Sequence, residues 1–485
     1  MVDGENDKAG GKKAVFASTI TTNPAPFTPV RLTVIFDIVQ TIHWFTMTKN
    51  ETQLPYAPPL QPELTSPSRP FRFGPALLVT AAFIGPGTVL TASKAGAQYG
   101  YTLLWAIVFA VFTTIVFQEM AARLGIVSKG GLANAIRTTF RNPSTKWAAI
   151  SLVLGAILFG NCAYQTGNIM GAATGLEILT PLPSTVWAIA IAVVALTVIM
   201  IGRLAVLQWF LASLVAIMGL VFTISAILCG PEIVSLIGGL KPTIPDGSEW
   251  AIVGLIGTTV VPYNLFLHAS AAANKYSADG SVPTGDEQHN DNVLAGHVRH
   301  SLLDTILSIT VGGIITASLM VTAAVTFRDA EIGQVGDIAA QLRPSLGTWA
   351  ESIFAIGLFA AGLTSSITAP IAAAYAAAGC FGWDARLQDW KLRTVAGIVV
   401  VVGLAFAIAF GSSPAETIIV AQIANGLLLP IVAIFLLYVL NRKELLGRFT
   451  NGWLANGLGI IVVIMTFLIA ARQFTSVIKK LSDGL

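Results

Sequence analysis

Residues 83–88, Phe83-Ile84-Gly85-Pro86-Gly87-Thr88, interrupt an apolar run that extends from about Pro75 to Leu90. Proline has no backbone N–H and clashes with the preceding helical turn, while glycine tolerates an open backbone. Inside a bilayer, opened backbone is tolerated only where protein or a water-filled cavity satisfies its polar groups. We therefore expect a broken membrane helix whose exposed amides and carbonyls form part of a binding site.

A second interruption, Thr258-Thr259-Val260-Val261-Pro262-Tyr263-Asn264, lies in a later apolar segment. Two interrupted spans at corresponding positions of two halves are the best sequence indication of a transporter's binding site. The alternative is a pair of ordinary proline kinks, which are common in membrane helices. The two interruptions together favour the binding site.

The composition is that of a polytopic membrane protein. Of its 485 residues, 54% are hydrophobic and 11% are charged, and its mean hydropathy is +0.74, whereas soluble proteins carry about 25% charged residues. The isolated Cys162, Cys229 and Cys380 predict neither a disulfide framework nor a thiolate metal site. No nucleotide-binding Walker A pattern is present, which leaves ATP-driven pumping without support. We expect no enzymatic activity, no cofactor and no nucleic-acid partner; the expected partners are membrane lipid and a small solute or ion as cargo.

The apolar segments predict an all-α protein with eleven membrane spans within residues 72–474. A cytoplasmic, disordered tail is expected at residues 1–71, and a short tail at residues 475–485. The spans are expected near residues 74–98, 101–124, 146–178, 183–202, 204–229, 249–274, 302–327, 347–379, 394–411, 415–440 and 453–471.

The distribution of Lys and Arg predicts a cytoplasmic N-terminus and an outside C-terminus. The expected membrane is the plasma (inner) membrane. With that orientation most basic loop residues are cytoplasmic. The outer loops and the C-terminus hold only Lys241, Arg328, Arg343, Arg472, Lys479 and Lys480.

The interrupted spans are the first and the sixth, so they would run in opposite directions across the membrane. This arrangement is typical of two inverted repeats of five helices, with the eleventh span outside the repeat. No internal identity between the halves is visible, so the inference rests on the topology and the two breaks.

The interruptions belong to a wider set of motifs, which are Gly85-Pro86-Gly87-Thr88, Tyr99-Gly100-Tyr101-Thr102-Leu103-Leu104-Trp105, Val261-Pro262-Tyr263-Asn264-Leu265-Phe266-Leu267-His268 and Ala361-Gly362-Leu363-Thr364-Ser365-Ser366-Ile367-Thr368. They resemble the Nramp family of divalent-metal transporters, whose corresponding stretches read Asp-Pro-Gly-Asn, Phe-Gly-Tyr-x-Leu-Leu-Trp, Met-Pro-His-Asn-Leu-Tyr-Leu-His and Ala-Gly-Gln-Ser-Ser-Thr-Ile-Thr. The resemblance covers most of residues 72–440. It implies a LeuT-type fold with helices 1 and 6 broken, and secondary-active transport by alternating access.

The chain departs from the family's pattern where the family binds its ion. Metal-transporting members use an Asp and an Asn of the first helix and a Met of the sixth; these positions here are Gly85, Thr88 and Val261. The resemblance implies a substrate site of Gly85, Pro86, Gly87, Thr88, Thr258, Val261, Pro262, Tyr263 and Gln422. It implies a polar or proton path of Gln165, Asn168 and His268, where Gln165 and Asn168 stand at the family's third-helix acids. Gln165 and Asn168, three residues apart, are expected to share one helix face.

A site without carboxylates is chemically unlike a divalent-metal site. A divalent cation that leaves water needs hard oxygen ligands and usually a carboxylate, while helix N-termini attract anionic groups. We therefore expect a small polar organic solute such as an amino acid as cargo. The alternative is Mg²⁺ or Mn²⁺, held by carbonyls and hydroxyls. His268 is either a packing residue or part of a proton path.

Overall fold

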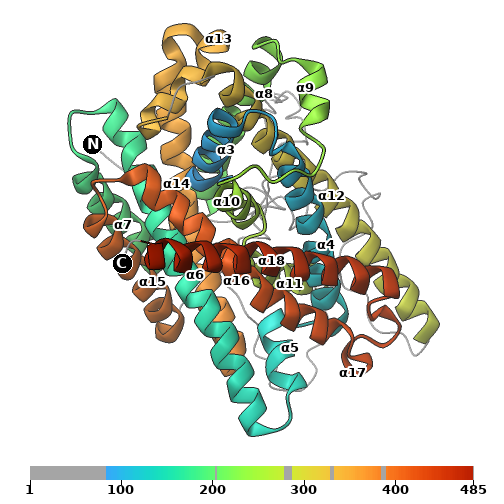
Figure 1. Cartoon of the computed structure of the whole chain (residues 1–485). Helices are drawn as coiled ribbons and strands as arrows, with labels where there is room; N and C mark the ends of the chain where they lie inside the picture. Colours follow the sequence, from blue (N-terminus) through green and yellow to red (C-terminus); the bar gives the residue numbers. More distant parts are fainter. Residues whose placement is uncertain (1–83, 202–204, 278–286, 328–331, 384–388, 484–485) are drawn as a thin grey trace, which may run out of the picture.

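The computed structural model describes residues 84–201, 205–277, 287–327, 332–383 and 389–483, and the regular elements in these ranges are helices. Nine long helices make up most of the bundle in Figure 1: α4 (Leu104–Ser128), α6 (Pro143–Leu179), α7 (Ser184–Ile201), α8 (Ala205–Leu228), α12 (Glu287–Thr326), α14 (Ala350–Phe381), α15 (Trp390–Ala409), α16 (Pro414–Leu440) and α18 (Trp453–Asp483). The interrupted segments supply α3 (Pro86–Tyr99), α10 (Glu249–Thr259) and α11 (Pro262–Ser277). Short connecting helices are α5 (Leu132–Thr139), α9 (Ile233–Gly238), η1 (Val335–Leu342), α13 (Arg343–Leu346), η2 (Gly347–Trp349), α17 (Lys443–Leu446) and η3 (Gly447–Phe449).

Each of the eleven expected segments contains a helix, but fewer than eleven meet the length and hydropathy of a membrane span within the described residues. Within the described ranges nine spans are long and apolar enough to cross a membrane, and a tenth exists if one bent helix pair counts as a single span. Helix α3 lies in the first expected span, whose earlier residues, like the predicted tail at 1–71, lie outside the described residues. Several helices extend past the apolar limits: α6 begins at Pro143 and α12 at Glu287, because a helical backbone can continue into water.

Close approaches between helices build the centre of the bundle. Helix α14 packs along α6, and a Cβ added at Gly362 of α14 would lie 2.5 Å from the Ala172 nitrogen of α6. Small residues allow such backbone contacts in lipid, where no hydrophobic force drives helices together. Helices α6, α10, α12 and α16 surround α3, so the first break is buried in the bundle.

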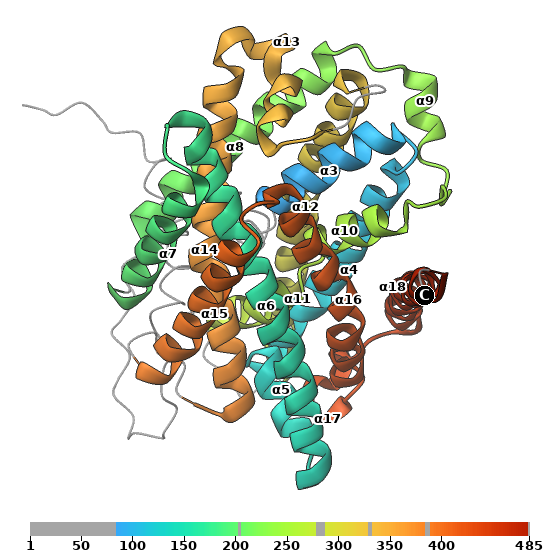
Figure 2. The ribbon, with the colours of Figure 1, turned by 60° about the vertical axis from the view of Figure 1, so that its left-hand side comes forward.

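Helix α18 does not run alongside the other helices, as an eleventh span was expected to do. It lies across α16, α10 and α4, horizontal in Figure 1 and seen end-on in Figure 2. The chain bends by 118° between the α17–η3 segment and α18. Arg123 of α4 holds this bend, because its guanidinium donates to the Phe449 carbonyl at 2.6 Å and to Asn451 Oδ1 at 2.7 Å. The side of the membrane on which the C-terminus lies stays a prediction.

Candidate transport site

The first break leaves backbone donors at the start of α3. Gly85 precedes the helix in an extended conformation (φ −110°, ψ −177°), and Pro86 is its first residue. Val89 N–H donates to the Gly85 carbonyl at 3.2 Å, and no side chain caps the helix. The amide of Gly87 therefore has no acceptor within the helix. The predicted interruption at Gly85 is confirmed as a helix start.

The second break separates α10 from α11. Helix α10 ends at Thr259, its final turn closed by Val260 N–H on the Ile256 carbonyl at 2.8 Å, and α11 begins at Pro262. The last carbonyls of α10 are left without helical donors. Val261 lies in this break and is fully buried. The sixth span is thus broken, as expected, rather than kinked.

The two breaks meet through their threonines. The hydroxyls of Thr88 and Thr258 are 2.7 Å apart, in the interior of the protein. Near the other end of the same helix pair, Tyr99 Oη donates to the Gly247 carbonyl at 2.8 Å. Helices α3 and α10 therefore run antiparallel, with the N-terminus of α3 beside the C-terminus of α10. This direction agrees with inverted repeats.

Polar side chains from α6 and α14 face the open position at Gly85. A Cβ built there would lie 3.4 Å from Tyr164 Oη, 3.5 Å from Ser365 Oγ and 3.9 Å from Asn168 Oδ1. Tyr164 also meets Tyr263 of α11 edge-on, with ring centroids 5.7 Å apart. The structure thus brings residues of α3, α6, α11 and α14 to one place, and the groups around Gly85 are uncharged.

Gln422 of α16 contacts the first turn of α3 more closely than the sequence indicated. A Cβ at Gly87 would fall 2.1 Å from Gln422 Nε2, so only glycine admits this amide. Gln422 Nε2 also lies 3.4 Å from the Ile418 carbonyl of its own helix. Pro86 is in turn covered by Gly171 of α6, where a Cβ would lie 2.1 Å from the proline Cβ. Gly87 and Gly171 therefore allow the start of α3 to pack closely between α6 and α16.

Gln165 and His268 have other neighbours. Gln165 Nε2 donates to the Ser366 carbonyl at 3.0 Å and its side chain covers Gly403 of α15, whereas Asn168 faces Gly85. Residues three apart on a helix differ by about 60° in direction around its axis. Gln165 and Asn168 therefore share a broad face of α6 but contact different neighbours. His268 is fully buried, with Nδ1 2.8 Å from Gln118 Oε1 of α4. This contact supports a packing role for His268.

Sequence reasoning missed two residues that face Gly85. Tyr164 precedes Asn168 by one helical turn, so the i, i+4 spacing on α6 was an available signal. Ser365 belongs to a run of hydroxyl residues on α14, Thr364 to Ser366, and nothing in the sequence indicates which of them faces the break.

Several polar atoms of this region have no partner among the described residues. They include Asn168 Nδ2, Ser365 Oγ and Gln422 Oε1. A buried polar group without a hydrogen bond is costly, and such groups are rare in folded proteins. A polar cargo would satisfy them. In the same described ranges no group of three or more His, Cys, Asp or Glu side chains could share a metal ion.

Thr258→Val tests the link between the two breaks. We expect it to destabilise the protein by about 1 kcal/mol, the net value of one hydrogen bond, measured by thermal unfolding in detergent. Thr259→Val is the matched control, because the Thr259 hydroxyl donates to the Leu255 carbonyl of its own helix, at 2.9 Å, and does not join the two breaks. Equal loss of stability in both variants would contradict the role assigned to the Thr88–Thr258 pair.

Comparison with known proteins places this geometry in a family. The family model described as "Natural resistance-associated macrophage protein-like" matches residues 76–476. The chain belongs to the Nramp family. Nramp proteins are membrane transporters rather than enzymes, so the chain is a multi-pass membrane transporter.

Curated Nramp relatives cover most of the chain. The "Divalent metal cation transporter MntH" of Deinococcus radiodurans is 27% identical over 398 residues, which is 81% of this chain and 86% of the relative. The protein of the same name from Brucella suis biovar 1 is 29% identical over 419 residues, 83% of this chain and 88% of the relative.

Solved structures show the same fold. The Eremococcus coleocola manganese transporter, in complex with an aromatic bis-isothiourea substituted compound, has a TM-score of 0.64 at 23% identity and covers 83% of this chain and 86% of its own. The inward-facing conformation of Mhp1 has a TM-score of 0.51 at 15% identity, covering 84% of this chain and 92% of its own. The expected LeuT-type fold is thereby supported for this Nramp chain.

Proposed function

We propose that this Nramp transporter works by alternating access and carries a small polar organic solute, such as an amino acid. The observation that carries the proposal is the junction of the breaks: the N-terminus of α3 meets the C-terminus of α10 at the Thr88–Thr258 hydrogen bond. The side chains that surround Gly85 there, Tyr164, Asn168 and Ser365, are uncharged.

The backbone dipoles at this junction suit a zwitterion. A helix N-terminus carries roughly half a positive elementary charge and a C-terminus roughly half a negative one. The amide of Gly87 would face a carboxylate, and the last carbonyls of α10 would face an ammonium group. Helix α11 also begins at its break, at Pro262. Two positive helix ends and one negative end disfavour a bare divalent cation.

Unpartnered side-chain atoms add matching hydrogen-bonding groups. Asn168 Nδ2 is a donor, Ser365 Oγ donates or accepts, and Gln422 Oε1 is an acceptor. Gly85 leaves open the volume that a side chain would fill, because a Cβ there meets its first neighbour only at 3.4 Å. These features support a small cargo with both donor and acceptor groups.

A divalent metal cation is the second candidate cargo. The relatives favour it over an organic solute, since those named above are called divalent metal cation transporters or a manganese transporter. Mg²⁺ or Mn²⁺ would be held by main-chain carbonyls, the Thr88 and Thr258 hydroxyls and the Gln422 amide. Mg²⁺ keeps several of its waters when bound to protein, so a partly hydrated ion suits neutral ligands best. The uncharged surroundings of Gly85 argue against this candidate, and the relatives' names argue for it.

Influx into proteoliposomes separates the candidates. Purified full-length protein is reconstituted, and Mn²⁺ and Mg²⁺ entry is recorded with an enclosed indicator dye against protein-free vesicles. The organic-cargo proposal predicts no saturable metal influx, and saturable uptake of at least one labelled amino acid on the same vesicles. Saturable Mn²⁺ or Mg²⁺ influx without amino-acid uptake would establish the second candidate in its place.

The orientation and membrane are proposed along with the function. We propose that the N-terminus is cytoplasmic, as the Lys and Arg distribution predicts, and that the protein resides in the plasma (inner) membrane. The loop between α16 and α18, with Arg442, Lys443 and Arg448, then lies on the cytoplasmic side.

A further inference from the structure

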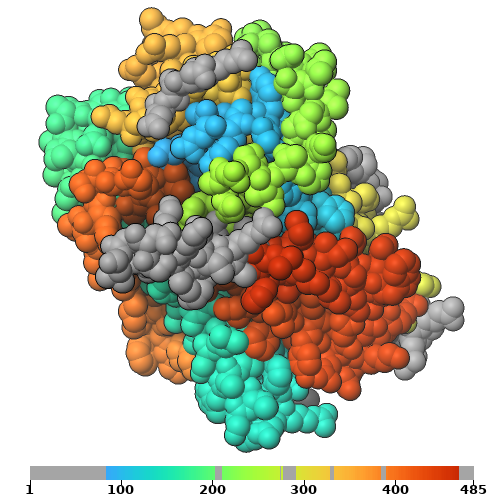
Figure 3. All heavy atoms as spheres, viewed as in Figure 1, coloured from blue at the N-terminus to red at the C-terminus, as the bar shows by residue number. Residues whose placement is uncertain are grey.

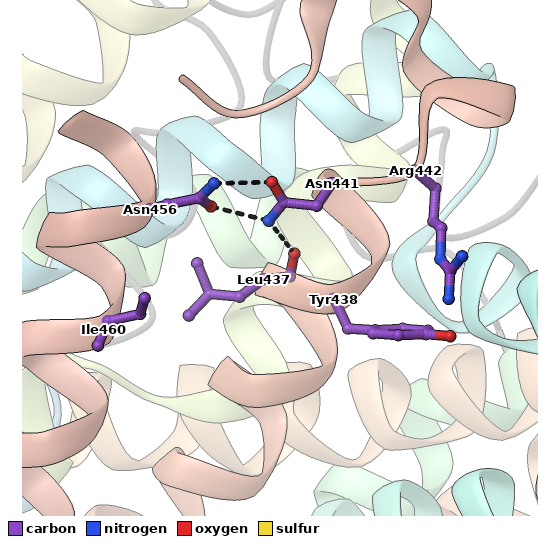
Figure 4. Close-up of a pocket in the computed structure, with 6 residues that line it drawn as sticks. All are labelled: Leu437, Tyr438, Asn441, Arg442, Asn456 and Ile460. Atoms are coloured by element: carbon purple, nitrogen blue, oxygen red, sulfur yellow. Dashed lines mark hydrogen bonds between the residues drawn. The ribbon is translucent and has the colours of Figure 1, made fainter. Parts of the chain in front are cut away.

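A pocket lies where the end of α16 meets the start of α18, far from the transport site. It has a volume of about 470 Å³ and is lined by Leu437, Tyr438, Asn441, Arg442, Asn456 and Ile460 (Figure 4). Along α16, Gln422 of the transport site lies about 22 Å from Leu437, the first pocket residue, at 1.5 Å per residue. The pocket is therefore separate from the junction of the breaks.

The amide wall of this pocket is a closed hydrogen-bond network. Asn441 Nδ2 donates to Asn456 Oδ1 at 2.8 Å, and Asn456 Nδ2 donates back to Asn441 Oδ1 at 2.7 Å (Figure 4). Asn451 Nδ2 also donates to Asn456 Oδ1, at 2.9 Å, and Asn451 Oδ1 accepts from Arg123 Nη2 at 2.7 Å. The amides satisfy one another, which fixes the wall and leaves ligand binding to other groups.

Arg442 is the charged group of the pocket. Its guanidinium carbon lies 4.2 Å from the centre of the Tyr438 ring, which stacks on Phe140 with centroids 5.1 Å apart. No ion pair joins Arg442 to a carboxylate in the described part of the chain, whereas Arg448 pairs with Asp291 at 3.0 Å. The adjacent Lys443 and Glu444 offset each other in charge. An ordered guanidinium with free donors suits an anion, and phosphate in particular.

Apolar surface continues from the pocket along both helices. Ile434 of α16 and Ile460, Ile461 and Ile464 of α18 are each at least half exposed, with exposed fractions of 50–54%. The red residues of α16 to α18 form a broad area of the face in Figure 3. In a membrane transporter such surface faces lipid chains. A ligand for the whole feature therefore has an anionic head and an apolar tail.

We propose that this pocket binds an anionic phospholipid, with the phosphate on Arg442 and an acyl chain along the isoleucines of α16 and α18. The lipid bridges the two helices at the point where the chain bends. Negatively charged lipids attract basic residues at the membrane surface by about 1 kcal/mol for each Lys or Arg, which corresponds to about fivefold in affinity.

The test is lipid binding to the full-length protein in detergent, with phosphatidylglycerol and phosphatidylcholine as probes. Native mass spectrometry measures lipid retention, and thermal unfolding measures stabilisation. We expect wild type to retain phosphatidylglycerol in preference to phosphatidylcholine. Arg442→Gln should weaken that retention about fivefold. Arg343→Gln is the matched control: Arg343 is an exposed arginine on α13, at another part of the bundle, 3.6 Å from Glu351.

A second variant keeps the charge and blocks the tail. Ile460→Trp fills the apolar side of the pocket and should also reduce phosphatidylglycerol retention. If Arg442→Gln fails to fold, Ile460→Trp alone tests whether the pocket binds the lipid. Inorganic phosphate and glycerol phosphate should give no stabilisation. The proposal is overturned if folded Arg442→Gln or folded Ile460→Trp retains as much phosphatidylglycerol as wild type. It is also overturned if wild type retains both lipids equally, or if inorganic phosphate stabilises wild type as strongly as the lipid.

Discussion

Gly257→Ala is expected to destabilise the protein by about 3 kcal/mol, the upper end of the usual effect of overpacking, and to abolish uptake. A Cβ at Gly257 of α10 would lie 2.0 Å from the Gln422 carbonyl oxygen and 2.5 Å from the Gly426 nitrogen of α16. Both neighbours are backbone atoms, so no side chain can rotate away and the helices must separate. The separation would move Thr258 away from Thr88 and shift Gln422, which packs on Gly87.

The matched control is Gly155→Ala on α6. Gly155 is exposed, and a Cβ there meets no atom within 4 Å. Alanine is favoured over glycine inside a helix by about 0.5–1 kcal/mol, so this variant should be as stable as wild type or more stable. Thermal unfolding in detergent and uptake into proteoliposomes measure both effects. If Gly257→Ala unfolds at the wild-type temperature, the close α10–α16 packing is wrong.

The breaks were predictable from sequence because they depend on local backbone chemistry. Pro86 and Pro262 each begin a helix, as residues without an N–H are expected to do at a first turn. The apolar segments of the sequence likewise predicted the positions of the helices, and each expected span contains one. The direction of α18 could not be predicted from the length of its apolar segment. It depends on hydrogen bonds from Arg123 to Phe449 and Asn451, which lie more than three hundred residues after Arg123 in the sequence.

The side-chain surroundings of the site were less predictable. The motif comparison located Gly85 and Gln422, but it gave no reason for Gly87 or Gly171, whose small size admits Gln422 and Pro86. The packing of α6 and α14 against the break decides that Tyr164 and Ser365 face Gly85. The i, i+4 spacing places Tyr164 on the helix face of Asn168, but the sequence does not show which face meets the break or which hydroxyl of α14 lies opposite it.

Gly85→Asp is expected to lower organic-solute uptake about a hundredfold, because like charges brought together at a binding site cost several kcal/mol. The substitution fits the fold: φ at residue 85 is −110°, and the nearest atom to a Cβ there is Tyr164 Oη at 3.4 Å. Aspartate is a favourable residue immediately before a helix, where its carboxylate accepts from first-turn amides. The amide of Gly87 would then be occupied, and a second carboxylate would be repelled.

Gly85→Asn separates charge from bulk. Asparagine has nearly the size of aspartate and also caps helices well, but it is neutral. If charge is decisive, Gly85→Asn retains much more solute uptake than Gly85→Asp, and both variants unfold at or above the wild-type temperature. Equal loss of uptake would show that the cargo needs the space at Gly85 rather than a site free of negative charge. If the cargo is instead Mn²⁺ or Mg²⁺, the added carboxylate supplies the ligand that such ions prefer, and Gly85→Asp alone should raise metal influx above wild type.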